Sequence, residues 1–190
     1  MPPRTGVSSP NLLQEIAQAF LVNDQMNQLL LQHLDPRAWR AKPPGKNGRT
    51  IADIFAHVHN IRCKWLRLSA PHLKQPARLD RRRCTQKQVQ AALVQSALCC
   101  SEMLADALAL SPRRVQSFLR DGWARRWRPG AAMFAYMISH EAHHRGQACM
   151  LAHQLGLRLP TYAGYTMWHW EKLWKQCGFE LATAPKTNRS

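Results

Sequence analysis

Apolar residues recur every three to four positions in four long stretches of the chain, a spacing typical of amphipathic helices. These stretches cover residues 11–34, 50–69, 85–110 and 129–155. A shorter stretch of the same kind follows at residues 166–176. No stretch shows the apolar–polar alternation of a half-buried strand. The pattern therefore predicts an all-α protein with four long helices and a short C-terminal helix.

Capping signals mark several ends of the predicted helices. Thr50 is followed by Asp53 and Thr85 by Gln88, which is the spacing of a capping box. Gly156 follows the fourth helical stretch and suits the C-terminal end of a helix. The signals therefore agree with the helices that the apolar pattern predicts.

Length and composition fit one globular domain. The chain has 190 residues, of which 45% are hydrophobic and 20% charged. The longest strictly apolar run covers only residues 131–138, whereas a membrane-spanning helix needs about 20 residues. We therefore expect a single domain over residues 11–178, a flexible N-terminus at 1–10, a flexible tail at 179–190 and no membrane association.

The chain is strongly basic, with 27 Lys and Arg against 11 Asp and Glu and a net charge of +16. Such an excess favours a polyanion or an anionic substrate as partner, but it also occurs on solvated surfaces. Many of these residues fall in the long connections at 70–84 and 111–128, where Trp123 and Trp127 are interleaved with arginine. The arginines that could contact nucleic acid are Arg81, Arg82, Arg83, Arg125 and Arg126.

The six cysteines predict thiols rather than disulfides. Their spacing shows no pairs, no CxxC motif is present, and four of them fall inside predicted helices. The first ten residues contain no apolar stretch like that of a secretory leader. We therefore expect reduced cysteines and a cytoplasmic location.

Histidine placement carries the strongest chemical signal. At about 100° per residue, His140 and His144 lie in the middle of the apolar face of their helix, and His143 lies on its flank. Imidazoles four residues apart point the same way and can share one metal ion. In the second helix, His57 lies at the edge of the core face and His59 on the far side. We therefore expect His57, and not His59, to turn toward a neighbouring helix.

Two other interpretations of these histidines stay open. They can be core residues with hydrogen-bonded rings, although two imidazoles on one apolar face need partners for four nitrogens. The segment at 140–144 also matches HExxH, the zinc motif of metalloproteases. Gln147 and Met150 stand where the extended motif has Gly and His, and no carboxylate occurs between Glu141 and Glu171. The residues thus favour a metal site over a protease.

The first predicted helix carries polar residues on the face that should be buried. Asp24 and Asn27 lie within about 40° of Phe20 on the helical wheel. These side chains can line a pocket or form polar pairs inside the core. The sequence leaves both roles open.

Three segments together resemble the DinB/YfiT-like family. They are NDQMNQLLL at residues 23–31, GRTIADIFAH at 48–57 and HEAHHRGQ at 140–147. The resemblance extends over about residues 11–178. It implies an up-down-down-up four-helix bundle, often a homodimer, with long crossover connections. It also implies a metal triad of His57, His140 and His144, the same three residues that the periodicity selects.

The resemblance further implies a divalent metal, with Zn or Ni favoured and Fe or Mn as alternatives. Similar proteins include transferases and isomerases that use low-molecular-weight thiols, while others have no known activity. Three neutral imidazoles would leave the ion its full charge, which lowers the pKa of a bound thiol or water. We therefore expect a metal-dependent S-transferase or hydrolase acting on a small electrophile.

Supporting roles follow from position. Glu141 or Tyr136 is expected to shuttle a proton, and Asp53, one turn before His57, to accept a hydrogen bond from its ring. The further residues expected around the metal or its pocket are His143, Gln147 and Asn27. Two other classes remain: a basic nucleic-acid-binding or DNA-damage-response protein with no catalytic activity, and a metal-binding protein without turnover.

Overall fold

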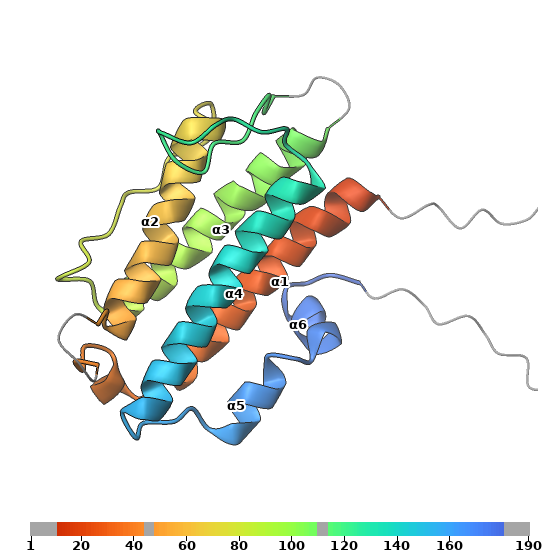
Figure 1. Cartoon of the computed structure of the whole chain (residues 1–190). Coiled ribbons are helices and arrows are strands. Elements are labelled where there is room, and N and C mark those ends of the chain that lie inside the picture. Colours follow the sequence, from red (N-terminus) through yellow and green to blue (C-terminus); the bar gives the residue numbers. More distant parts are fainter. Residues whose placement is uncertain (1–10, 44–47, 110–113, 181–190) are drawn as a thin grey trace, which may run out of the picture.

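The computed structural model describes residues 11–43, 48–109 and 114–180, and their regular structure is helical (Figure 1). One isolated bridge pairs Phe118 with Trp127. The α-helices are α1 (Leu12–His33), α2 (Ile51–Ser69), α3 (Gln86–Leu108), α4 (Ala131–Gln154), α5 (Thr161–Thr166) and α6 (Trp170–Gln176), and a 3-10 turn covers Pro36–Ala38. The prediction of an all-α protein is confirmed.

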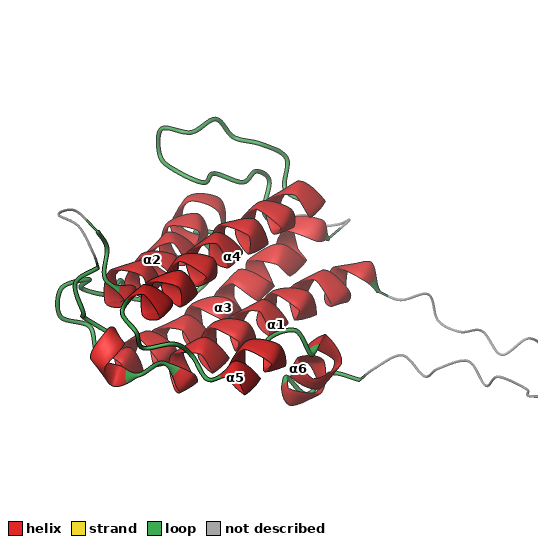
Figure 2. Cartoon of the chain, turned by 60° about the horizontal axis from the view of Figure 1, so that its bottom comes forward, coloured by secondary structure: helices red, strands yellow, loops and turns green. Residues whose placement is uncertain are grey.

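The four long helices lie side by side and enclose the core (Figures 1 and 2). Helix α1 contacts α3 and α4, and α2 contacts the same two helices. Fully buried side chains fill the space between them, among them Phe20 of α1, Trp65 of α2, Met103 of α3 and Met137 of α4. The short helices α5 and α6 pack on α1, outside this core.

The predicted caps are present in the structure. The hydroxyl oxygens of Thr50 and Thr85 accept hydrogen bonds from the backbone N–H of Asp53 and Gln88, and both capping boxes are complete. Helix α4 begins at Ala131, slightly later than predicted, and ends before Gly156, whose φ of 72° favours glycine. These local signals therefore set the helix ends within a few residues.

The connection between α2 and α3 returns along the bundle to the start of α2. The backbone N–H of Ala52 donates to the carbonyl of Trp39 at 2.9 Å. The indole of Trp39 donates to the carbonyl of Cys84, which precedes α3, at 3.2 Å. The first residues of α2 and of α3 therefore lie at the same end of the molecule (Figure 1).

The connection between α3 and α4 is pinned to the other end of α2. Phe118 and Trp127 exchange two backbone hydrogen bonds, at 3.0 and 3.2 Å, and their rings stack at 5.4 Å. Lys64 of α2 forms an ion pair with Asp121 at 3.0 Å. These contacts anchor the loop at one end of α2, while its outer part projects into solvent (Figure 2), where Trp123 is 75% exposed.

The predicted helix at 166–176 is wrong in its extent, because the structure has two short helices there. Helix α5 begins at Thr161, before the predicted start, and a turn at 167–169 separates it from α6. Its residues are poor helix formers, including two threonines and Gly164, so the sequence pattern does not mark them. Leu173 of α6 packs on the bundle, where it is fully buried.

The predicted flexible ends are mostly outside the described residues. Residues 1–10 and 181–190 lie outside the residues that the structure describes. Phe179 and Glu180, assigned to the tail, contact α6: the Phe179 ring lies 5.4 Å from that of Trp174, and the Trp174 indole donates to the Glu180 carbonyl at 3.0 Å. The described part of the chain thus continues to Glu180.

Helix α3 is the one described helix that is long and apolar enough to cross a membrane by length and composition. It contacts α1 and α2. Val89, Leu93, Cys100 and Leu104 are fully buried on the side that faces them. These contacts are those of a core helix.

All six cysteines lie among the described residues and all are free, as predicted. Cys63, Cys84, Cys99 and Cys100 are buried. Burial raises the pKa of the Cys63 thiol to about 11 and that of Cys100 well above its usual range. These cysteines are therefore protonated packing residues at neutral pH.

Candidate metal centre

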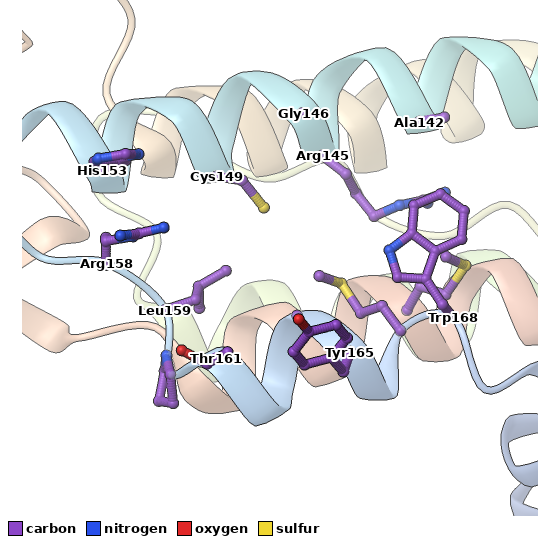
Figure 3. Close-up of a pocket in the computed structure, with 14 residues that line it drawn as sticks. Ala142, Arg145, Gly146, Cys149, His153, Arg158, Leu159, Thr161, Tyr165 and Trp168 are labelled. Atoms are coloured by element: carbon purple, nitrogen blue, oxygen red, sulfur yellow. The ribbon is translucent and has the colours of Figure 1, made fainter.

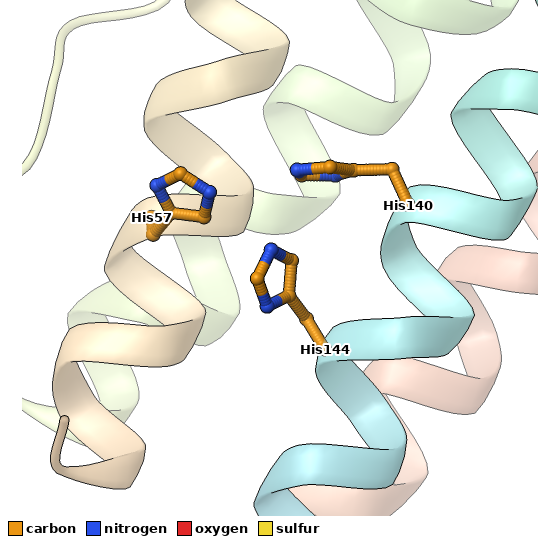
Figure 4. A group of neighbouring side chains, drawn as sticks. All are labelled: His57, His140 and His144. Carbon is orange, nitrogen blue, oxygen red and sulfur yellow. The ribbon is translucent and has the colours of Figure 1, made fainter. Parts of the chain in front are cut away.

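Three histidines from two helices converge on one point between α2 and α4. His57 comes from α2, and His140 and His144 come from successive turns of α4 (Figure 4). Each offers a ring nitrogen, and these atoms all lie within 4.8 Å of one another. The ring centroids are 4.6 to 5.5 Å apart. This arrangement suits three ligands of a single tetrahedral ion with one position left over.

The ring of His144 is oriented by a neighbour on its own helix. Its Nδ1 lies 2.8 Å from Oε1 of Gln147. With the proton on Nδ1, the ring donates to this oxygen, and Nε2 keeps its lone pair for a metal. The expected role of Gln147 beside the site therefore agrees with its position.

One ring nitrogen of His140 lacks a bonding partner. Its Nδ1 is buried and has no hydrogen-bond partner among the described residues. A buried polar atom without a partner costs free energy, and a metal ion or a water molecule would satisfy it. Together with the all-imidazole donor set, this atom indicates that the three residues fit a divalent metal ion.

Burial keeps the three imidazoles neutral. It lowers the pKa of His57 to about 3 and that of His140 to about 4, and it also lowers the pKa of His144. The proximity of His144 lowers the pKa of the other two further. The neutral form is the one that binds a metal, so the apo site is ready at physiological pH.

Aromatic rings form one wall of the site. The centroid of Trp65 lies 5.3 Å from that of His140, and Tyr136 lies 6.3 Å from it. Trp127 contacts Tyr136 at 5.3 Å from the loop before α4. Tyr136 thus brings a phenol near the triad, and its role as a proton shuttle remains a prediction.

Positive charge also lies near the triad. Arg49 and Arg81 act electrostatically on His57 and lower its pKa. Beside the triad, Arg49, His143 and Gln147 line a surface cavity of about 670 Å³. His143 itself is exposed, and its ring lies 5.1 Å from that of His144. This exposed flank agrees with its predicted place beside the site.

A buried ion-pair network lies behind the triad and joins all four long helices. Arg62 of α2 donates to both carboxylate oxygens of Glu141 of α4, at 2.7 and 2.6 Å. Its Nη1 donates to Asp24 of α1 at 2.8 Å and to the carbonyl of Leu93 of α3 at 3.0 Å. Both Arg62 and Glu141 are fully buried. The network therefore fixes α4 at the residue next to His140.

The predicted proton shuttle by Glu141 is wrong. Its carboxylate accepts hydrogen bonds from Arg62 and also from Asn23 and Asn27, at 2.7 and 2.9 Å. Burial works to raise the pKa of Glu141, but the Arg62 guanidinium lowers it below its usual value. The side chain points into the bundle core, about 100° around α4 from His140. The metalloprotease interpretation fails for the same reason, because its Glu would have to reach the metal.

The polar residues of α1 prove to be core partners rather than pocket residues. Asp24 pairs with Arg62, and Asn27 donates to Glu141. Asn27 is fully buried, and its Oδ1 accepts from Arg145 at 3.1 Å. This decides between the two roles that the sequence left open, and it corrects the assignment of Asn27 to the metal pocket.

Two predictions about α2 also need correction. Asp53 does not orient His57, because its Oδ2 is bound by the backbone N–H and hydroxyl of Thr50 at 3.1 and 2.8 Å in the capping box. His59 does face a neighbour: its Nδ1 lies 3.1 Å from Ser96 Oγ of α3, and its Nε2 lies 2.9 Å from the carbonyl of Ala77. The α2–α3 connection covers the side of α2 that the hydrophobic pattern predicts to be exposed to solvent.

The two predicted groups of basic residues lie at opposite ends of α2. Arg81, Arg82 and Arg83 precede Cys84 near the start of this helix, whereas Arg125 and Arg126 belong to the loop pinned at its other end. A helix of 19 residues is roughly 28 Å long. Trp127, one of the two tryptophans interleaved with arginine, packs on Phe118. The structure therefore does not join these residues into one nucleic-acid surface.

Sequence reasoning missed Arg62, the residue on which the network depends. The available signal was charge balance: Asp24 and Glu141 lie among buried positions, and a buried carboxylate needs a cation. Only the packing of α1, α2 and α4 shows that Arg62 is the cation that contacts both carboxylates.

Comparison with protein families agrees with this site. The sequence matches the model of the DinB family over residues 7–176. The chain belongs to the DinB family. The match covers the whole bundle of this DinB-family protein and includes all three histidines. No curated protein and no solved structure matches the chain.

Substituting Gln147 tests how the DinB-family triad is oriented. Gln147→Leu removes the acceptor of His144 Nδ1–H, so we expect metal affinity to fall by about 10- to 100-fold while one ion still binds at saturation. Competition with a chromophoric chelator measures the affinity. Gln154→Leu, an exposed glutamine on the same helix, is the matched control. Equal affinities for the two variants would show that this hydrogen bond does not orient the ligand.

Proposed function

We propose that this protein binds a divalent metal ion through His57, His140 and His144 and activates a low-molecular-weight thiol or water against a small electrophile. The convergence of three neutral imidazoles within 4.8 Å is the observation that supports this best. Among the described residues, no carboxylate belongs to this cluster. Neutral ligands leave the positive charge of the ion uncompensated, which suits activation of a nucleophile.

Each residue of the site has its own role in this proposal. The imidazoles hold the ion, and Gln147 orients one of them. A bound divalent ion supplies Lewis-acid chemistry and lowers the pKa of a thiol or water to near neutrality. The Tyr136 hydroxyl donates or accepts a proton at the leaving group, and its half-buried ring packs against an apolar electrophile, whereas the fully buried Trp65 packs on the ring of His140.

The metal and the assembly are part of the same proposal. Histidine ligands suit several first-row metals, and we favour Zn or Ni over Fe or Mn. The start of α2 and of α3 at one end of the molecule supports an up-down-down-up bundle. The proposal also includes that the protein is a homodimer located in the cytoplasm.

Two chromogenic reactions test the proposed chemistry. In the first, a thiol such as cysteine or glutathione displaces chloride from 1-chloro-2,4-dinitrobenzene: a C–S bond forms, the C–Cl bond breaks, and the thiol proton is released. In the second, water hydrolyses 4-nitrophenyl acetate. Metal-loaded wild-type protein should accelerate one of them, and His140→Ala should lose about 100-fold or more, because Lewis-acid activation contributes several kcal/mol.

The control is a histidine of α4 outside the triad. His153→Ala removes an exposed imidazole and should react as the wild type does. Equal rates for wild type and His140→Ala in both reactions, with metal bound only to the wild type, would contradict a catalytic role and favour metal binding without turnover.

A further inference from the structure

A second cavity lies between α4, α5 and the segment that joins them (Figure 3). Its volume is about 570 Å³, within the range of small-molecule sites. Its residues on α4 include Arg145, Cys149 and His153, which lie about 100–180° around the helix from His144. No histidine of the triad lines it. The cavity is therefore separate from the metal centre.

The walls combine apolar surface with positive charge. Leu159, Met167, Tyr165 and Trp168 supply most of the apolar side chains near α5 (Figure 3). The charged groups are Arg145 and Arg158, and the other titratable groups are His153, Cys149 and Tyr165. None of the lining residues is Asp or Glu. The cavity walls thus carry positive charge and no carboxylate, and the buried carboxylates of Glu141 and Asp24 act on Arg145 from inside the core.

Arg145 is the buried member of this group. It is only 9% exposed, and its Nη1 donates to Asn27 Oδ1 at 3.1 Å and to the carbonyl of Asn23 at 3.4 Å. Among the described residues, its Nε and Nη2 make no hydrogen bond. A guanidinium has five N–H donors in a planar fork that matches a carboxylate. Arg145 therefore keeps donors for an anion at the cavity wall.

The rim of the cavity is rich in exposed aromatic surface. Trp168 is 76% exposed and Tyr165 is 66% exposed. Large aromatic side chains gain free energy when an apolar group covers them. A ligand with only a charge would leave this surface in water, whereas a ligand with an apolar body would cover it.

We propose that this cavity binds a small organic anion with an apolar body, of the class of aromatic or short aliphatic carboxylates. The carboxylate accepts hydrogen bonds from Arg145, with Arg158 adding positive charge at the mouth. The apolar body packs on Trp168 and Tyr165. This site is independent of the metal and of the proposed catalytic function.

Titration with 2-naphthoate tests the proposal, using isothermal calorimetry and tryptophan fluorescence. We expect saturable binding of one molecule per chain, with at least tenfold weaker binding of the uncharged isostere 2-naphthamide. Arg158→Gln should weaken binding of 2-naphthoate and leave that of the amide unchanged. Binding should also weaken with added salt.

A cavity-filling variant locates the ligand without touching the buried network. Gly164 lines the cavity, and a Cβ there would meet nothing within 4 Å, so Gly164→Leu fills the space without a backbone clash. It should weaken binding more than tenfold. Gly122→Leu, at a glycine with equally open surroundings in the α3–α4 connection, should bind as the wild type does.

Three results would overturn the proposal. They are no saturable binding to wild type at millimolar 2-naphthoate, equal affinity for the acid and the amide, and unchanged binding to Gly164→Leu. The metal-site variant His144→Ala should keep full affinity for 2-naphthoate. Loss of binding in that variant would place the ligand at the metal centre instead, whereas failure of the metal proposal alone would leave this binding intact.

Discussion

Arg62→Met is expected to lower the free energy of unfolding by about 3–5 kcal/mol. Arg62 is fully buried and forms ion pairs with Asp24 and Glu141, at 2.8 and 2.6 Å. Methionine fills much of the same volume but leaves two carboxylates buried without their cation. Burial alone would lower the pKa of Arg62, but the two carboxylates raise it above its usual value. Denaturation in urea, followed by circular dichroism, measures the change.

Two further variants separate lost charge pairing from lost packing. Arg67→Met removes an exposed arginine from the same helix and should change stability by no more than about 0.5 kcal/mol. Adding Asp24→Asn and Glu141→Gln to Arg62→Met removes the stranded charges and should restore part of the stability. A loss below about 1 kcal/mol for Arg62→Met would show that the network contributes little to holding the four helices together.

Alanine at any one of the three triad positions is expected to weaken divalent-metal binding by more than about 100-fold. The loss should exceed the 10- to 100-fold that removal of an orienting contact costs, because a ligand itself is removed. Each substitution leaves two imidazoles, and neither α2 nor α4 offers a fourth imidazole or a carboxylate to the cluster. Competition titration with Zn²⁺ and Ni²⁺ measures the affinities of His57→Ala, His140→Ala and His144→Ala.

The variants must remain folded for this comparison. His57 and His140 are only half-buried, and no hydrogen bond to other described residues is lost with them, so their alanine variants should keep the helical circular dichroism of the wild type. His153→Ala should bind metal with wild-type affinity. A triad variant that is folded and binds as tightly as His153→Ala would mean that its histidine is not a ligand.

Much of the fold and the triad could be predicted from local patterns. The capping boxes at Thr50 and Thr85 place the starts of α2 and α3, because these contacts form between residues three apart. His140 and His144 are recognisable because residues four apart share one face of a helix. Those predictions depend on helix geometry alone, which does not change with tertiary packing.

Several of the errors arise where distant segments meet. The direction of Glu141 depends on Arg62, which is 79 residues earlier in the chain. The burial of His59 depends on the α2–α3 connection folding back along α2. The division of the arginines between two ends of the molecule depends on where both loops are pinned. None of these contacts leaves a periodic signal in the sequence.

The most direct test of the metal site is elemental analysis of the purified, untagged protein, before and after supply of Zn²⁺ or Ni²⁺. Wild type and His153→Ala should each hold about one divalent ion per chain, and His57→Ala and His144→Ala should hold almost none. A wild-type protein that binds no metal even when supplied with it, or equal metal content in all four proteins, would contradict the triad assignment.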